Sequence, residues 1–150
     1  DRQTAVRDRN GRYLARELAR IEGVIPQRRG PEITRCSHHL FLFRVEAGVF
    51  PVPRDRFIEA LRAEGIPCSA GYPVPLYRQP LFLAKAFAPF AASARKRRDV
   101  NYAKLRLPVV ERLCSECVWL EQSVMLGTRR DMQSIVRAVK KIRDNYRELA

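Results

Sequence analysis

The sequence HHLFLFRVE, residues 38–46, decides the fold class of this chain. Phe41, Phe43 and Val45 recur at every second position, which is typical of a β-strand with one buried face. The apolar runs at residues 66–71 and 117–120 predict two further short strands. A sheet with its apolar residues on one face requires a second layer to cover that face.

The covering layer is predicted to be helical. Apolar residues repeat at helical spacing in residues 3–22 and 53–64, and Gly23 and Gly65 follow as stop signals. The final helix begins with Thr128 and Asp131, which form a capping box. Its apolar stripe predicts a core-facing side and comprises Met132, Ile135, Val136, Val139 and Ile142.

The middle of the chain is less regular. Residues 81–102 are predicted to be helical in pieces, interrupted near Pro89, and residues 109–117 are predicted to form a short helix. Residues 24–37 are predicted to be a connector. Taken in order, these elements predict an α/β (α+β) fold, a small and mostly antiparallel sheet layered with helices.

Composition limits the classes of function. The chain has 150 residues, 46% of them hydrophobic, which suits one globular domain. It has 29 basic and 16 acidic side chains, a formal charge of +13, and nine of the basic residues lie within positions 78–112. This excess leaves a polyanion-binding protein as one alternative. We expect no nucleic-acid partner, because no zinc-finger spacing, RNP-type motif or basic zipper is present.

No apolar run approaches the length of a membrane helix, and the first residues lack the apolar segment of a signal peptide. We therefore expect a cytoplasmic protein without a membrane partner. The chain opens inside a helical pattern without an initiator methionine, which indicates a piece of a longer protein.

Residues suited to catalysis or metal binding are scarce. The chain has neither a GxGxxG nor a GxxxxGK[ST] phosphate loop, and no GxSxG elbow. His38 and His39 are adjacent, so on a strand they would point to opposite faces, and the single CxxC pair, Cys114 and Cys117, has no second pair to complete a zinc site. We therefore expect no metal site, reduced thiols, and no catalytic residue of the chain's own.

The stretch IPCSAGYPVPLYRQP, residues 66–80, predicts a stiff loop. Pro73, Pro75 and Pro80 restrict the backbone and withhold N–H donors, so a sheet cannot continue through them. Tyr72 and Tyr77 lie in this loop. From the residues alone, it is either a structural crossover with packed tyrosines or a binding loop presented by the sheet.

Several motifs, in order, resemble the C-terminal part of the DegT/DnrJ/StrS-type sugar aminotransferases. These are pyridoxal 5'-phosphate (PLP) enzymes of the aspartate aminotransferase fold type I. The resemblance covers nearly the whole chain. The motifs that carry it are Arg7-x-x-Asn10 with Tyr13-Leu14, His39-x-Phe41-x-Phe43, Arg54-Asp55 with Gly65-Ile66, Tyr72-Pro73-x-Pro75-Leu76 with Gln79-Pro80, and Leu107-Pro108-Val109-x-Glu111-Arg112.

The resemblance implies a division of labour within a longer protein. Residues 1–22 would be the helix linking two domains, and residues 23–150 the C-terminal small domain. The lysine that holds PLP would lie in an earlier large domain absent from this chain, so the chain alone is expected to be inactive. The parent would be a cytoplasmic, homodimeric aminotransferase of sugar biosynthesis that transfers an amino group from an amino acid to a keto-sugar.

The resemblance also implies substrate-binding roles for Tyr72, Tyr77 and Arg78, at the mouth of the active site. Gly71 and Tyr77 stand where histidine is common in the family, so a cyclitol ketone is as compatible as a keto-sugar. The alternative is a stand-alone binding module with the same fold. In the isolated chain, we expect the apolar stripe of the first helix at Val6, Tyr13 and Leu14 to be exposed.

Overall fold

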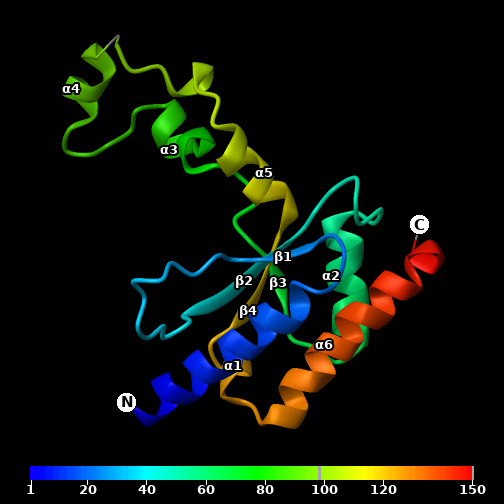
Figure 1. Ribbon diagram of the computed structural model, residues 1–150. Coiled ribbons are helices and arrows are strands. Elements are labelled where there is room, and N and C mark those ends of the chain that lie inside the picture. The colour runs from blue at the N-terminus through cyan, green and yellow to red at the C-terminus, as the bar shows by residue number, and fades with distance from the viewer. Residues whose placement is uncertain (98, 150) are drawn as a thin grey trace. The chain divides into compact units, whose positions relative to one another are not determined.

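The computed structural model describes residues 1–97 and 99–149 of the protein (Figure 1). The chain divides into two compact units, residues 1–71 with 116–150, and residues 72–115. The first unit holds a four-stranded sheet with three long helices. Its elements are α1 (Arg2–Leu18), β1 (Val24–Pro26), β2 (Leu40–Val45), α2 (Arg54–Ala63), β3 (Ser69–Ala70), β4 (Cys117–Glu121), η3 (Val124–Leu126), α6 (Arg129–Asp144) and η4 (Tyr146–Leu149).

The sheet is antiparallel throughout, in the order β1-β2-β4-β3. β2 pairs with β4 so that Phe41 lies opposite Leu120 and Phe43 lies opposite Val118. These four side chains are buried, whereas the alternate positions of both strands are only partly buried or exposed. The α/β class with a mostly antiparallel sheet is therefore confirmed, and the period of two in residues 40–45 marks its buried face.

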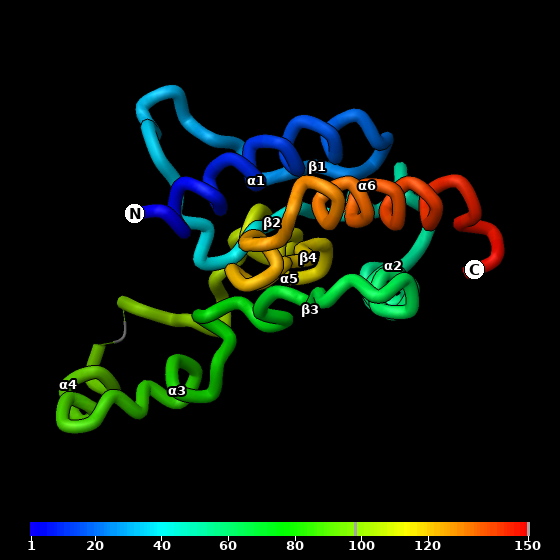
Figure 2. Tube along the Cα trace, turned by 90° about the horizontal axis from the view of Figure 1, so that it is seen from below, coloured from blue at the N-terminus to red at the C-terminus, as the bar shows by residue number. Residues whose placement is uncertain are grey.

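The helices supply the other side of the core. α1 and α6 lie side by side in both views (Figures 1 and 2), and α2 also contacts α6. Leu14 of α1, Phe57 of α2 and Val139 of α6 are fully buried in one cluster with Phe43 of the sheet. The core is thus a single apolar layer between one sheet face and three helices.

The predicted elements largely match the observed ones. The capping box of α6 is confirmed: Thr128 accepts a hydrogen bond from the Asp131 N–H, and the Asp131 carboxylate accepts one from the Thr128 N–H. The connector prediction for residues 24–37 missed β1, because a three-residue edge strand containing Pro26 carries too short a pattern to recognise. The strand predicted at 66–71 is limited to Ser69 and Ala70.

Two expectations about side-chain placement were wrong. Tyr13 and Leu14 are buried against the rest of the first unit, and Val6 is partly buried, so the α1 stripe is covered within this chain. His38 precedes β2 with a positive φ of 45°, so it does not alternate with His39 as two strand residues would. Within the described residues, no group of three or more His, Cys, Asp or Glu side chains could hold a metal ion.

The second unit, residues 72–115, has little regular structure. It contains η1 (Leu76–Arg78), α3 (Pro80–Leu83), α4 (Ala91–Lys96), η2 (Tyr102–Lys104) and most of α5 (Pro108–Glu116). Phe82, Phe87 and Tyr102 form a cluster of edge-to-face ring contacts with centroids 5.3–6.3 Å apart. None of the helices in 1–97 and 99–149 combines the length and apolar character that a bilayer crossing requires.

Candidate functional site

The loop that follows β3 is the candidate site, because it holds the three residues expected to bind substrate. Gly71 ends the sheet by donating its N–H to the Cys117 carbonyl at 3.3 Å. Pro73 and Pro75 then prevent further ladder pairing, and the backbone turns into η1 and α3, with Pro80 at the first position of α3. The sequence prediction that a loop leaves the sheet at this point is confirmed by these element bounds.

Tyr77 and Arg78 converge on one carboxylate, that of Glu111 in the first turn of α5. The Tyr77 hydroxyl donates a hydrogen bond to Glu111 Oε1, and Arg78 Nη2 donates to the same oxygen at 2.9 Å. Glu111 Oε1 also accepts from the Leu107 N–H at 3.3 Å. Glu111 therefore joins η1 to the start of α5 within the second unit.

The electrostatics of this cluster favour a charged Glu111 and a neutral Tyr77. The hydrogen bond from Tyr77 is the main cause that lowers the pKa of Glu111, and Arg78 adds to it. Burial, followed by the hydrogen bond to Glu111, raises the pKa of Tyr77. Sequence reasoning named Glu111 only as part of the Leu107–Arg112 motif and missed its role as the shared acceptor, because the contact spans 34 positions.

The three expected residues differ in how much surface they present. Tyr72 is 75% exposed, and the Arg78 side chain is 41% exposed beside its carboxylate partner. Tyr77 is buried, with its ring 5.5 Å from the Arg78 guanidinium. Tyr72 therefore presents an aromatic face, Arg78 has donors beyond the one bonded to Glu111, and Tyr77 fixes the backbone between them.

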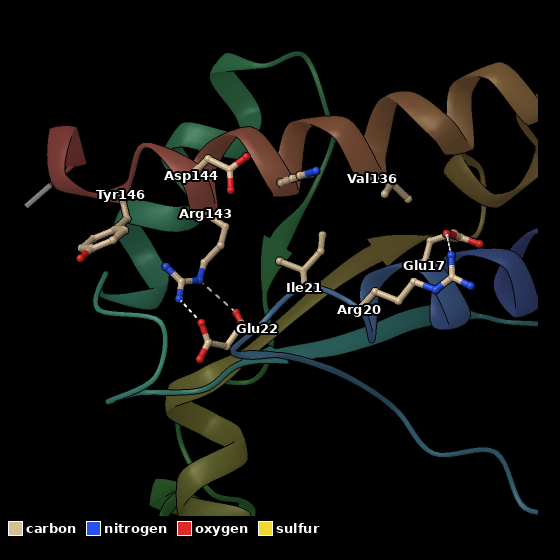
Figure 3. Close-up of a pocket in the computed structure, with 9 residues that line it drawn as sticks. Glu17, Arg20, Ile21, Glu22, Val136, Arg143, Asp144 and Tyr146 are labelled. Atoms are coloured by element: carbon tan, nitrogen blue, oxygen red, sulfur yellow. Dashed lines mark hydrogen bonds and ion pairs between the residues drawn. The ribbon is translucent and has the colours of Figure 1, made fainter.

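A groove of about 580 Å³ lies elsewhere, between the C-terminal ends of α1 and α6 (Figure 3). Ile21 and Val136 supply its apolar lining, and Arg143 crosses it to reach Glu22, with Nη2 2.5 Å from Oε2. The remaining lining includes charges of both signs and no histidine, cysteine or serine. None of the residues that the sequence predicts to bind substrate lies in this groove.

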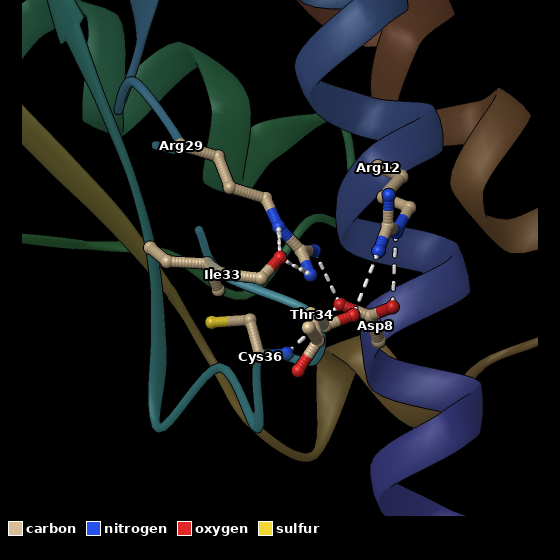
Figure 4. A network of polar contacts seen from close by, with 6 residues as sticks. All are labelled: Asp8, Arg12, Arg29, Ile33, Thr34 and Cys36. Carbon is tan, nitrogen blue, oxygen red and sulfur yellow. Dashed lines mark hydrogen bonds and ion pairs between the residues drawn. The ribbon is translucent and has the colours of Figure 1, made fainter. Parts of the chain in front are cut away.

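A polar cluster around Asp8 fastens the segment before β2 to α1 (Figure 4). Asp8 accepts hydrogen bonds from Arg29, from the Cys36 N–H at 2.9 Å and from Arg12 Nε at 3.0 Å. Burial raises the pKa of Asp8, but these hydrogen bonds outweigh it and hold the value at about 2. Arg29 also donates to the Ile33 carbonyl, so the cluster holds a segment that forms no sheet ladder.

Comparison with known proteins gives a consistent result along the chain. Residues 1–140 match the DegT/DnrJ/EryC1/StrS aminotransferase family. The chain belongs to this family. The match covers most of the first unit and the whole candidate loop, so it confirms the resemblance read from the ordered motifs.

Individual relatives in the family match the chain along nearly its whole length. It is 31% identical to an L-glutamine:2-deoxy-scyllo-inosose aminotransferase of Streptoalloteichus tenebrarius, covering 99% of this chain and 35% of the relative. It is 30% identical to an L-glutamine:scyllo-inosose aminotransferase of Streptomyces griseus, covering 100% of this chain and 35% of the relative. The chain thus spans about a third of the length of these relatives.

A solved structure of the same fold supports the architecture. The crystal structure of 3-amino-5-hydroxybenzoic acid synthase superposes with a TM-score of 0.68 at 25% identity, covering 94% of this chain and 34% of that one. This chain and the matching third of that synthase therefore share the arrangement of sheet and helices described above.

The cofactor that the family implies, PLP, can be tested against the lysines of this chain. All five lysines lie in the described residues and none is buried: Lys85, Lys96, Lys104, Lys140 and Lys141. Lys141 is engaged by Glu64, with Nζ 2.7 Å from Oε1, and this contact raises its pKa. A lysine that forms a Schiff base needs surroundings that lower its pKa. The lysines present here do not fit that role.

Proposed function

We propose that this chain is the C-terminal part of a PLP-dependent aminotransferase that transfers an amino group from an amino acid to a cyclitol ketone or keto-sugar. Residues 1–22 are the helix that links two domains, and residues 23–150 form the small domain. The observation that carries the proposal is the similarity along 99% of this chain to a glutamine-dependent inosose aminotransferase.

The substrate class follows from the activities for which the relatives are named. Both of the relatives described above are named for glutamine as donor and an inosose as acceptor. Gly71 and Tyr77, which stand where histidine is common in the family, also favour a cyclitol ketone over a nucleotide-linked sugar. We therefore propose a six-membered ring ketone as acceptor and L-glutamine as donor.

The candidate loop supplies the substrate contacts in this proposal. Tyr72 presents its exposed ring to the apolar face of a polyol, and its hydroxyl donates to or accepts from a ring hydroxyl. Arg78 keeps Glu111 as a partner and offers its remaining N–H groups to the substrate. Tyr77 is buried within this loop, and its role in the proposal is to hold Tyr72 and Arg78 in position for the substrate.

The amino-transfer chemistry belongs outside this chain. When bound, PLP supplies the electron sink for moving an amino group between a donor and a ketone. No lysine described above suits its attachment, so we assign that role to the remaining two-thirds of a longer polypeptide. The parent enzyme is proposed to act in the cytoplasm as a homodimer.

The test compares the longer polypeptide that contains this sequence with the 150-residue chain alone. Each is incubated with PLP, L-glutamine and either scyllo-inosose or 2-deoxy-scyllo-inosose, and the aminocyclitol is quantified by mass spectrometry. We expect product and a lysine-bound cofactor absorbance band only with the longer protein. Amination by the 150-residue chain alone would contradict the proposal, as would a PLP-loaded longer protein that aminates neither ring ketone nor a keto-sugar.

A further inference from the structure

Exposed apolar side chains are concentrated in one part of the chain. Among the described residues, fifteen large apolar side chains are exposed, and eleven of these lie within residues 72–115. The four outside this unit are Ile25, Ile33, Val49 and Leu126. Scattered exposed apolar residues are ordinary, but such a concentration in one short unit marks an interaction surface.

The same unit has almost no core. Among its described residues only Pro75 and Tyr77 are buried, and neither is part of the main core cluster. The ring cluster of Phe82, Phe87 and Tyr102 is only partly buried. Segments of about 40 residues rarely bury enough apolar surface to be stable alone. Residues 72–115 therefore need a covering surface.

Helix α5 carries part of this exposed apolar surface along one of its sides. Val109, Val110 and Leu113 lie three and four positions apart, so they share one side of this nine-residue helix. Val109 is 60% exposed and Leu113 is 40% exposed. Leu105 and Leu107, just before the helix, are also exposed. We call these five residues the α5 apolar surface.

The net charge of residues 72–115 restricts the kind of surface that could cover them. Residues 72–115 contain nine basic and two acidic side chains, a net charge of +7, and the rest of the chain has a net charge of +6. Arg106 and Arg112 flank the α5 apolar surface and are exposed. A second copy of this chain would present a positively charged surface to a positively charged unit, which disfavours self-pairing.

We propose that the α5 apolar surface docks on an apolar surface rimmed by acidic side chains, located in the part of the longer polypeptide that this chain does not contain. This inference rests on the proposed function, which makes the chain about a third of its parent. The aliphatic side chains fit an apolar surface, and Arg106 and Arg112 fit the acidic rim. A nucleic acid would satisfy the arginines but leave the five aliphatic side chains uncovered.

The test introduces Val109→Glu together with Leu113→Glu into both the 150-residue chain and the longer protein. Both side chains are exposed in this chain and glutamate is a good helix former, so the variant should melt at the same temperature as the wild type in the 150-residue chain. In the longer protein, buried carboxylates facing an acidic rim should lower the melting temperature by several degrees. Val49→Glu is the matched control, because Val49 has a similar exposure and lies outside the unit.

A second measurement uses unmodified proteins. Amide hydrogen exchange in residues 105–115 should be slower in the longer protein than in the 150-residue chain, by roughly tenfold or more. Equal exchange in both proteins would overturn the proposal. So would a double variant that leaves both melting temperatures unchanged, or that lowers both by the same amount. A 150-residue chain that sediments as a dimer and is dispersed by the double variant would show a second copy to be the partner instead.

Neither readout requires turnover, so the two proposals fail separately. A longer protein that shows the differential effect but aminates no ketone would leave the docking surface standing and refute the proposed function. An active longer protein in which the double variant has no effect would refute the docking surface alone.

Discussion

The ring of His38 occupies the space that a side chain at Gly11 would fill. A Cβ built on Gly11 would lie 2.2 Å from His38 Nε2 and 2.7 Å from both neighbouring ring carbons. Gly11 is buried in α1, and His38 reaches it from the segment before β2. His38 Nε2 is itself buried and has no hydrogen-bond partner in the described chain. The absence of a side chain at position 11 is therefore what admits the ring.

Replacing this glycine should reveal the contact. In the presence of His38, Gly11→Ala should lower the free energy of unfolding by about 1 kcal/mol or more, because the methyl group must expel the ring. The displaced ring should then regain water, and its pKa should rise toward the ordinary value. Chemical denaturation measures the first effect, and NMR titration of the His38 ring measures the second.

The double variant separates this clash from the intrinsic preference of the helix. In a His38→Ala background, Gly11→Ala should raise the free energy of unfolding by up to about 1 kcal/mol, since alanine favours helix more than glycine does. A double-mutant cycle gives the coupling between the two sites. Equal effects of Gly11→Ala in both backgrounds would show that the ring does not depend on Gly11.

Stability should depend on pH through His38. Burial lowers its pKa below 6.5, Arg29 and Arg7 act in the same direction, and Asp8 opposes them. The unfolded chain therefore binds this proton more tightly than the folded chain. The free energy of unfolding should be highest above about pH 6.5 and should fall as the pH drops below that value. Urea denaturation between pH 8 and pH 5 measures this dependence.

The control for the pH series is His38→Gln, which keeps a polar side chain but does not titrate. Its free energy of unfolding should vary less over the same pH range than that of the wild type. If the two curves have the same slope, His38 is not the group responsible.

Asp8 should matter at lower pH. Its pKa of about 2, against an ordinary 3.8, means that its contribution is complete above about pH 4 and is lost as the pH falls from 3.8 toward 2. At neutral pH, Asp8→Asn should lower the free energy of unfolding by roughly 1–3 kcal/mol, because Arg29 and the Cys36 N–H lose a charged acceptor. Denaturation measures the difference in the free energy of unfolding between the wild type and Asp8→Asn. This difference should be present at pH 7 and smaller at pH 2.5.

The Glu111 cluster should control the ionisation of Tyr77. Because burial and the hydrogen bond to Glu111 raise the pKa of Tyr77, Glu111→Gln should lower that pKa toward its ordinary value without removing the burial. The phenolate absorbance of wild type minus that of Tyr77→Phe isolates the Tyr77 titration. An unchanged titration in Glu111→Gln would mean that the carboxylate does not influence the phenol.

Substrate binding by the loop is testable in the longer enzyme. Tyr72→Ala should raise KM for the ring ketone several-fold with little change in kcat, because an exposed aromatic face contributes to binding rather than to the reacting atoms. Tyr72→Phe keeps the face and should restore most of the affinity. Kinetics that are unaffected by Tyr72→Ala would remove this residue from the substrate site.

The secondary structure of this chain was largely readable because its signals are local. The alternation in residues 40–45, the capping box at Thr128 and Asp131 and the glycine stops each depend on a few neighbouring residues. The ordered motifs likewise placed the chain in its family without any spatial information. The three-residue strand β1 escaped prediction, because its pairing with β2 supplies the stability that its own sequence does not.

The tertiary structure decided which side chains meet. Glu111 joins Tyr77 and Arg78 across more than 30 positions, and His38 meets Gly11 across 27, so neither contact leaves a periodic trace in the sequence. Packing also reversed the expectation for α1, whose apolar stripe is covered by this chain's own residues, and left the exposed apolar surface in residues 72–115. Local patterns fix which elements form, whereas burial and charge pairing are properties of residues that only the folded chain brings together.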